Sequence, residues 1–254
     1  MLVAERQRKI VELVNERQSI RVTELSQIFS VTEETIRRDL EKLEKENLLH
    51  RSHGGAVSID KDQTEVSYLE REVLHSKEKR AIALEATRLI DRGDLIILDA
   101  STTAWYMAKE IPDMPLTVIT NSIKVCIELS KKEQVKVICT GGMLLSQSLS
   151  YVGHLAERSL QHYHVNKAFI SCKGAHLQGG LSESNEWQAL LKKQMMNIAE
   201  QTILMVDSSK FATQTFVHVA HMEDVDQVIT DSHISEDYQL SLRDHNISLK
   251  VVAL

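Results

Sequence analysis

The chain has 254 residues, of which 43% are hydrophobic and 26% charged, and its formal net charge is −6 at pH 7. These values are ordinary for a globular protein of two domains, and no apolar run approaches the roughly 18 residues that a membrane span requires. The first residues are charged from Glu5 onward, unlike a signal peptide, so we expect a cytoplasmic protein.

The first two expected elements are short amphipathic helices. Apolar residues recur at the helical period over residues 6–16 and again over residues 24–29, where Thr23 is the expected N-cap. Only Ser-Val-Thr separates the second helix from the next one. Such a short connection favours the tight turn of a helix-turn-helix.

The third helix carries the strongest functional signal. Ser30 and Thr32 can cap its start. Its apolar stripe consists of Ile36, Leu40 and Leu43. At about 100° per residue, Arg38 points away from this stripe, while Thr35 and Arg37 flank it on opposite sides. Both arginines can therefore reach a ligand.

A short hairpin is expected after the third helix. Residues 48–49 can pair with residues 56–57 across the basic, glycine-ended segment 51–55. A helix with adjacent arginines followed by such a wing is typical of a winged helix-turn-helix DNA-binding domain.

The structural alternative is a three-helix domain whose arginines form solvated ion pairs with Glu33, Glu41 or Glu44. Residues 1–57 hold ten Lys or Arg and ten Asp or Glu, so this segment is neutral, unlike most nucleic-acid binders. Five cations are nevertheless bunched on the third helix and the wing, and we favour DNA binding. They are Arg37, Arg38, Lys42, Lys45 and Arg51.

The run TIRRDLEKLEKENLLHRSHGGA resembles the N-terminal signature of the DeoR family of bacterial sugar-metabolism regulators. The resemblance implies that the third helix and the wing contact double-stranded operator DNA. A guanidinium can bind guanine or a phosphate, and only guanine carries sequence information, so the role of each arginine stays open. The expected DNA-binding residues are Thr32, Thr35, Arg37, Arg38, Arg51, His53 and Gly54.

The remainder of the chain is expected to be an α/β domain. Residues 58–75 are polar and contain no proline or glycine, which favours a linker that merges into a helix. From Ser76, helical and apolar β-like stretches alternate, which predicts a mostly parallel sheet. The expected strands cover 95–99, 116–122, 135–142, 168–174, 202–211, 226–231 and 248–254. The expected domains are 1–57, 58–75 as linker, and 76–254. Because residues 1–57 sum to zero, the net negative charge lies in residues 58–254.

Polar residues close five of these strands, at the edge where ligands bind in open α/β sheets. They are Asp99, Asn121, Gly141, Lys173 with Gly174, and Asp207. Ser101, Thr102 and Thr103 start a helix whose amides and dipole suit a phosphate, and Lys210 can supply a positive charge. The pattern favours a phosphorylated small molecule, although the same residue types also cap helices and form turns.

The DeoR resemblance continues through this region. DASTT is similar to the family's Asp-x-Gly-Thr-Thr loop, and TNS, Gly141-Gly142 and DSSKF also match. The resemblance implies a sensor domain with the fold of ribose-5-phosphate isomerases and CoA transferases that binds a sugar phosphate. Ser101 stands where the family has glycine and Gln188 where it usually has glutamate, so no acidic role is carried over to Gln188.

Three cysteines, Cys126, Cys139 and Cys172, are widely spaced in or near apolar stretches, which favours reduced core thiols. The histidines lack companions at recognised ligand spacing, so we expect neither a metal nor a cofactor.

Our leading hypothesis is a transcriptional regulator, expected to be a repressor of a carbohydrate operon, that responds to a sugar phosphate. One small DNA-binding domain of residues 1–57, here called the head, reads few base pairs, so we expect a homodimer or homotetramer. One alternative is a sugar-phosphate isomerase with Asp99 or Asp207 as base and Lys210 as electrostatic partner. A second is that the head contacts protein.

Overall fold

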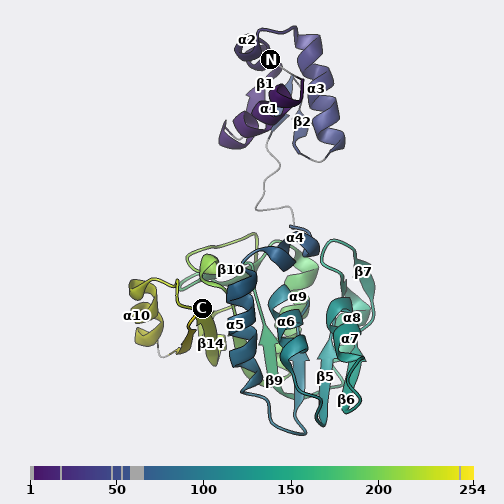
Figure 1. Ribbon diagram of the computed structural model, residues 1–254, viewed down its shortest axis with the longest axis vertical. Helices are drawn as coiled ribbons and strands as arrows, with labels where there is room; N and C mark the ends of the chain where they lie inside the picture. Colours follow the sequence, from purple (N-terminus) through teal and green to yellow (C-terminus); the bar gives the residue numbers. More distant parts are fainter. Residues whose placement is uncertain (1–2, 18, 47, 53, 58–65, 246) are drawn as a thin grey trace. The chain divides into compact units, whose positions relative to one another are not determined.

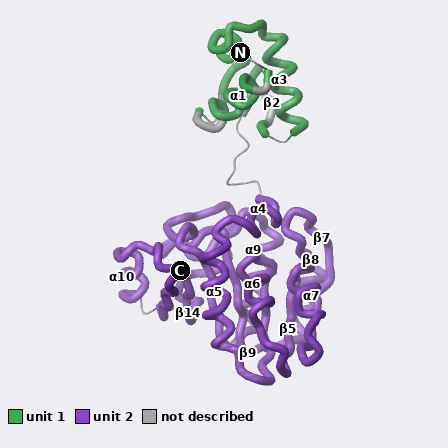
Figure 2. Tube along the Cα trace, viewed as in Figure 1, with its two compact units in different colours: residues 1–64 green, residues 65–254 purple. Residues whose placement is uncertain are grey.

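The computed structural model describes residues 3–17, 19–46, 48–52, 54–57, 66–245 and 247–254. The chain divides into two compact units, residues 1–64 and residues 65–254 (Figure 2). Figure 1 labels many of the described helices and strands.

The N-terminal unit contains three helices and a small antiparallel sheet with strand order β1-β3-β2 in its described part. Its elements are α1 (Val3–Arg17), β1 (Ser19–Arg21), α2 (Val22–Phe29), α3 (Glu33–Lys45), β2 (His50–Ser52) and β3 (Gly55–Val57). The apolar stripe of α3 is buried with residues of α1 and α2, as the helical period predicts. This unit is a winged helix-turn-helix.

The wing differs from the expectation in its strand pairing. Residues 55–57 pair with residues 50–52 rather than with residues 48–49, and their other edge pairs with β1, which was not expected. Leu49 is fully buried in the hydrophobic cluster of this unit. The ladder starts at His50, directly after this core residue.

The expected cap of the second helix is also wrong. α2 begins at Val22, and Thr23 lies inside the helix, while the N-cap residue Arg21 makes no side-chain capping bond. Arg21 is the last residue of β1 and pairs with Gly55. The backbone therefore passes directly from the ladder into the helix.

The C-terminal unit is built on a seven-stranded parallel sheet with order β15-β14-β12-β9-β4-β5-β6. Its strands are β4 (Leu95–Leu98), β5 (Leu116–Thr120), β6 (Val135–Cys139), β9 (Val165–Ile170), β12 (Ala199–Met205), β14 (Gln227–Asp231) and β15 (Ser248–Val252). The longer helices around it are α5 (Ser76–Thr87), α6 (Thr102–Glu110), α7 (Ile123–Leu129), α8 (His154–Leu160), α9 (Glu186–Asn197) and α10 (Glu236–Asp244). The expected α/β class with a parallel sheet is confirmed.

Alternation along β4 shows why this sheet needs helices on both faces. Ile96 and Leu98 pack in one cluster with α5, α6 and α7, and Ile97 packs in the other with α8, α9 and α10. All three strand residues are fully buried. A strand covered on both faces appears as a continuous apolar run, as residues 95–98 do.

Several elements were not expected from the sequence. They are the helices α4 (Tyr68–Val73), α8 and α10, the hairpin of β7 (Met143–Leu145) and β8 (Ser150–Val152), the strands β10 (Gly174–His176), β11 (Gly180–Glu183) and β13 (Val217–Ala220), and the 3-10 turns η1 (Ser208–Lys210) and η2 (Met222–Asp224). β10, β11 and β13 form a separate antiparallel sheet. The expected strand 168–174 is therefore split, because β9 ends at Ile170 and β10 starts in another sheet. α4 falls within the stretch 58–75 that was expected to be a linker.

The strand order places the point at which the chain changes direction between β4 and β9. From β4 the chain adds β5 and β6 on one side, and then returns to add β9, β12, β14 and β15 on the other. Ligands of open α/β sheets bind outside the carboxyl ends of the two strands at such a point.

Candidate functional site

The third helix of the N-terminal unit starts at a capped turn. The Thr32 hydroxyl accepts a hydrogen bond from the Thr35 backbone N–H at 3.3 Å and lies 2.9 Å from the Thr35 hydroxyl. Ser30 instead ends α2 in a left-handed conformation with φ of 51°. Of the two expected caps only Thr32 serves α3, where it satisfies a donor that the helix start leaves without a partner.

Both arginines of α3 lie on its solvent face. The Arg37 side chain is 51% exposed and pairs with Glu33 at 2.7 Å, and the Arg38 side chain is 80% exposed and lies 3.6 Å from Glu34. Exposed pairs at this spacing contribute only about 0.3–0.5 kcal/mol. Either guanidinium can therefore exchange its carboxylate for a phosphate or a base edge.

A buried ion pair holds α3 against α1. Arg6 Nε lies 2.6 Å from one carboxylate oxygen of Asp39, and Gln7 donates a hydrogen bond to the other oxygen at 2.9 Å. The three side chains are buried. Removing one partner of such a pair would leave a buried charge, so the pair resists rotation of α3 and fixes the direction of Arg37 and Arg38.

The wing is tied to the helices through its backbone. The Arg51 N–H donates to a carboxylate oxygen of Glu44 at 2.9 Å, and the Gly54 carbonyl accepts from the Val22 N–H at 2.9 Å. Gly54 has φ of 90°, a conformation that favours glycine. Arg51 is exposed, and His53 lies outside the described residues.

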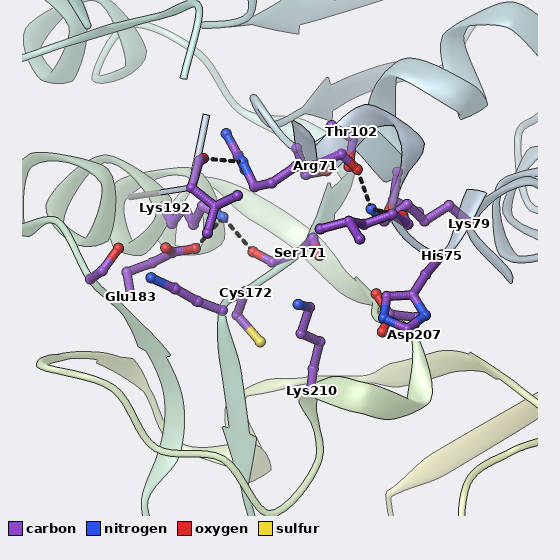
Figure 3. A pocket seen from close by; sticks show the side chains of 16 residues that line it. Arg71, His75, Lys79, Thr102, Ser171, Cys172, Glu183, Lys192, Asp207 and Lys210 are labelled. Atoms are coloured by element: carbon purple, nitrogen blue, oxygen red, sulfur yellow. Dashed lines mark hydrogen bonds and ion pairs between the residues drawn. The ribbon is translucent and has the colours of Figure 1, made fainter. Parts of the chain in front are cut away.

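The C-terminal unit holds a cavity of about 160 Å³ at the switch point between β4 and β9 (Figure 3). From the loops after these strands it is lined by Ser101, Thr102, Thr103, Ser171, Cys172 and Lys173. From elements further along the chain it is lined by Glu183, Ser184, Lys192, Asp207 and Lys210. From the stretch that precedes the sheet it is lined by Val66, Arg71, Leu74, His75 and Lys79.

The start of α6 forms one side of the cavity. The Ser101 hydroxyl caps the helix by accepting from the Ala104 N–H at 3.0 Å. The amides of Thr102 and Thr103 have no partner within the helix, because the first N–H groups of any helix lack one. These amides and the positive end of the helix dipole suit an anion.

A buried charge cluster forms the floor of the cavity. Asp99 accepts from the N–H groups of Ser101 at 3.0 Å and Ser171 at 2.9 Å, which joins the loops after β4 and β9. Lys192, on α9, pairs with Asp99 at 3.0 Å and with Glu183 at 2.7 Å, and it donates to the Ser171 carbonyl. Burial lowers the pKa of Lys192, but the two carboxylates outweigh it and raise this pKa above its ordinary value.

Lys79 is a second buried lysine at this cavity. Its ammonium donates to the carbonyls of Arg71 and Leu74, both at 2.6 Å. Burial lowers the pKa of Lys79 to about 8, and the nearby charge of Asp207 partly offsets this effect. Its proton is therefore held less firmly than that of an exposed lysine.

The charged side chains around the cavity are mainly basic. Five Lys or Arg residues and two carboxylates line it. The basic residues are Arg71, Lys79, Lys173, Lys192 and Lys210. Figure 3 shows the amino end of Lys210 pointing toward the centre of the labelled residues. Burial raises the pKa of the Cys172 thiol to about 12, so this thiol is protonated at neutral pH. The cavity favours an anionic ligand.

Six of the ten residues expected from the sequence line this cavity, and Asp99 lies beneath it. Asn121, Gly141 and Gly142 do not line it, because they follow β5 and β6 on the other side of the switch point. Asn121 donates to the Tyr151 carbonyl at 3.0 Å in β8. A Cβ on Gly142 would lie 2.7 Å from the Val152 carbonyl oxygen. Their contacts position the β7–β8 hairpin.

Sequence reasoning missed Arg71, Lys79, Glu183 and Lys192. Lys192 did carry a signal, since it lies beside Leu191 and four residues after Gln188 on the buried face of α9. Gln188 itself is buried and donates to the hydroxyls of Ser148 and Ser150, so it holds the hairpin rather than the cavity. The expectation of buried thiols is correct for Cys172 and wrong for Cys139, which is exposed at the end of the edge strand β6.

Known families match both units. The DeoR-like helix-turn-helix domain matches residues 6–62, and the DeoR C terminal sensor domain matches residues 74–232. The chain belongs to the DeoR family. Within the described residues, no helix is both long and apolar enough to cross a membrane.

Relatives of this DeoR protein match along its whole length. The HTH-type transcriptional regulator YulB of Bacillus subtilis is 61% identical over 100% of this chain and 98% of its own. The L-fucose operon activator of Haemophilus influenzae is 38% identical over 94% of this chain and 96% of its own. In the solved structure of ribose 5-phosphate isomerase A of Methanocaldococcus jannaschii, the similarity covers 54% of this chain and 55% of the isomerase chain, with 17% sequence identity and a TM-score of 0.41.

This DeoR-family chain is thus a DNA-binding transcriptional regulator with a sensor domain, as expected from the sequence. The isomerase alternative is not favoured, since the relatives that match the whole chain are regulators.

Proposed function

We propose that the exposed face of α3 and the wing bind operator DNA, and that a phosphorylated sugar in the switch-point cavity modulates this binding. The observation that carries the proposal is the cavity, because it joins the amide-rich start of α6 to the side chains of Lys173 and Lys210. Backbone amides at a helix start and a lysine ammonium are complementary to a phosphate. The DNA-facing residues in this proposal are Thr32, Thr35, Arg37, Arg38, Arg51 and Gly54.

Other lining residues suit the sugar part of the ligand. Ser171, Ser184 and Glu183 bring hydroxyl and carboxylate oxygens to the cavity. Such groups form hydrogen bonds with sugar hydroxyls, and a carboxylate accepts the stronger ones. The phosphate would thus lie at the start of α6 and the sugar toward Glu183.

We propose that the regulated genes serve carbohydrate use and that the protein represses them from the cytoplasm. The L-fucose operon activator among its relatives supports a sugar operon. Repression is the simplest result of operator binding, because a protein bound across the promoter excludes the polymerase. Activation would need an additional contact with the polymerase.

We propose a homodimer or homotetramer as the DNA-binding form. One winged helix reads few base pairs, and two heads together match a repeated or palindromic operator. The ligand must bind the DNA-competent and DNA-incompetent forms with different affinities, because otherwise it cannot change operator occupancy.

A thermal-shift screen of the full chain against pentose and hexose phosphates tests the ligand. A sugar phosphate that binds the folded chain raises its melting temperature, and the parent sugar without phosphate does not. Lys210→Ala should abolish this shift, whereas Lys136→Ala, an exposed lysine on β6, should preserve it.

Gel shifts on the DNA upstream of its own gene test the regulation. Binding should weaken steeply with salt, because phosphate contacts release counterions. The sugar phosphate found by thermal shift should change operator affinity in the wild type and not in Lys210→Ala. A ligand that stabilises the chain and leaves DNA affinity unchanged would contradict the proposal, and so would turnover of the sugar phosphate by the chain.

A further inference from the structure

The chain that enters the C-terminal unit forms one wall of the cavity. Residues 66–75 are the first described segment after the wing, and they contain α4. Four of them, Val66, Arg71, Leu74 and His75, line the cavity. In covalent order, this wall is therefore the part of the ligand site nearest to the DNA-binding unit.

Apolar packing holds α4 only weakly. Tyr68 is its one buried residue, whereas Leu69 is 68% and Val73 is 72% exposed. A helix that buries so little apolar surface gains little from the hydrophobic effect. Elements of this kind open at low cost and are the usual moving parts of regulated proteins.

Polar contacts also attach α4, beginning with the Tyr68 N–H, which donates to the Gln147 carbonyl at 2.7 Å. The Tyr106 hydroxyl, on α6, donates to the Glu72 carbonyl at 3.0 Å, and Lys124 pairs with the Glu72 carboxylate at 3.1 Å. The Ser67 hydroxyl caps the helix by accepting from the Glu70 N–H at 3.3 Å. These contacts lie outside the cavity lining, so they can be altered without touching the ligand site.

Lys79 connects this attachment to the cavity. Its ammonium has three donors, and two of them bind the carbonyls of Arg71 and Leu74 at the end of α4. The same side chain lines the cavity. Figure 3 shows Lys79 beside Arg71, across from Asp207. An anion in the cavity would stabilise the charged form of this lysine and strengthen both bonds to α4.

We propose that residues 66–75 are the switch segment of this regulator: an anionic ligand in the cavity acts through Lys79 to hold α4 more firmly, and this change in α4 alters operator binding by the DNA-binding unit. Lys79 is a positioning residue in this scheme. The inference rests on the proposed function, because it assigns the route by which the same cavity reports its occupancy.

Hydrogen exchange of the full chain, followed for peptides covering 66–75, tests the attachment without any ligand. Tyr106→Phe removes the bond to Glu72, and exchange in this segment should become about fivefold faster, as expected for the loss of one hydrogen bond. Tyr238→Phe is the matched control, because its hydroxyl also donates to a backbone carbonyl at 3.0 Å, that of Ala175. Ser67→Ala, which removes the α4 cap, is a second variant should Tyr106→Phe fold poorly.

Operator binding by the same ligand-free proteins tests the coupling. Loosening α4 should change the affinity for the DNA upstream of its own gene at least about threefold, in the same direction for Tyr106→Phe and Ser67→Ala, because the firmly held and loosened forms of a switch segment differ in their affinity for the operator. Tyr238→Phe should match the wild type. Faster exchange in residues 66–75 with unchanged DNA affinity would overturn the switch segment.

Inorganic phosphate, ribose 5-phosphate and fructose 6-phosphate serve as probes in a second arm. Whichever probe raises the melting temperature should slow exchange in residues 66–75. A raised melting temperature with unchanged exchange there would overturn the switch segment and leave the proposed function standing. If none of the three raises the melting temperature, the proposed function loses its support, and the ligand-free comparison still decides whether α4 is coupled to DNA binding.

Discussion

Replacing Lys192 with methionine tests the charge cluster beneath the cavity. The change leaves the carboxylates of Asp99 and Glu183 without the ammonium that lies 3.0 and 2.7 Å from them. Removing one partner of a buried ion pair costs about 3–5 kcal/mol. The N–H groups of Ser101 and Ser171 would still bind Asp99, so we expect a loss of about 3 kcal/mol.

Urea denaturation of the full chain at pH 7, read at the transition of the C-terminal unit, measures this loss. In a thermal denaturation of the same variant, the same loss should lower the midpoint temperature by about 6–12 °C for a unit of this size. Glu183→Gln removes one of the two carboxylates that lose their partner in Lys192→Met. The loss of unfolding free energy in the double variant Lys192→Met/Glu183→Gln should therefore be smaller than the sum of the two single losses by about 1–3 kcal/mol.

Lys131→Met is the matched control for this substitution. Its ammonium also lies within 3.0 Å of a carboxylate, that of Glu128, but its side chain is 63% exposed. Exposed pairs contribute little, and the loss should stay within about 0.5 kcal/mol. A loss below about 1 kcal/mol for Lys192→Met, or strictly additive effects of Lys192→Met and Glu183→Gln, would refute the assignment of a coupled buried cluster.

Three further predictions concern pH, DNA and the hairpin. Burial lowers the pKa of Lys79 to about 8 in the folded chain, against 10.5 in the unfolded chain. Between these pH values the unfolded chain binds more protons, so the free energy of unfolding should rise with pH by up to about 1 kcal/mol per pH unit. Lys79→Met should lose this slope in urea titrations from pH 8 to 10, and a retained slope would assign it to another group. Arg38→Ala should weaken operator binding by about 1–3 kcal/mol with relaxed sequence preference if it reads a base, or lower the salt slope by about 1 if it binds phosphate; unchanged binding in gel shifts at two salt concentrations would remove it from the interface. Gly142→Ala should lower the unfolding free energy by about 1–3 kcal/mol, because both its φ of 117° and the close Val152 carbonyl disfavour a Cβ at this position. Gly93→Ala is the control in the same denaturation assay. Gly93 has φ of 90° and open space around it, so this substitution measures the cost of the backbone conformation without a steric clash.

The DNA-binding unit could be predicted largely from local pattern. The stripe of Ile36, Leu40 and Leu43 places Arg38 on the opposite face, because side-chain direction in a helix depends only on residues within two turns. The wing ladder could not be placed in the same way. Its pairing depends on the burial of Leu49 and on β1, which lies about thirty residues earlier in the chain.

For the cavity, too, the sequence predicted some of the lining residues and not others. Its strand-end residues could be predicted, because the carboxyl ends of parallel strands lie at one edge of a sheet. The sequence did not predict which strand ends lie next to one another. Asn121 and Gly142 therefore contact the β7–β8 hairpin instead of lining the cavity. The alternation of helices and strands along the sequence does not determine the order of the strands in the sheet, because the same alternation is compatible with several orders.

The sequence by itself determined the family, the two-unit organisation, the exposed arginines and the residue types at the sheet edge, because these follow from short periods and contiguous motifs. Tertiary structure alone decided that the chain turns back between β4 and β9, and that Lys79 and Lys192 lie at that point. The physical reason is that a buried lysine is stable only where distant segments bring carbonyl or carboxylate oxygens to it, and those segments meet only in the folded chain.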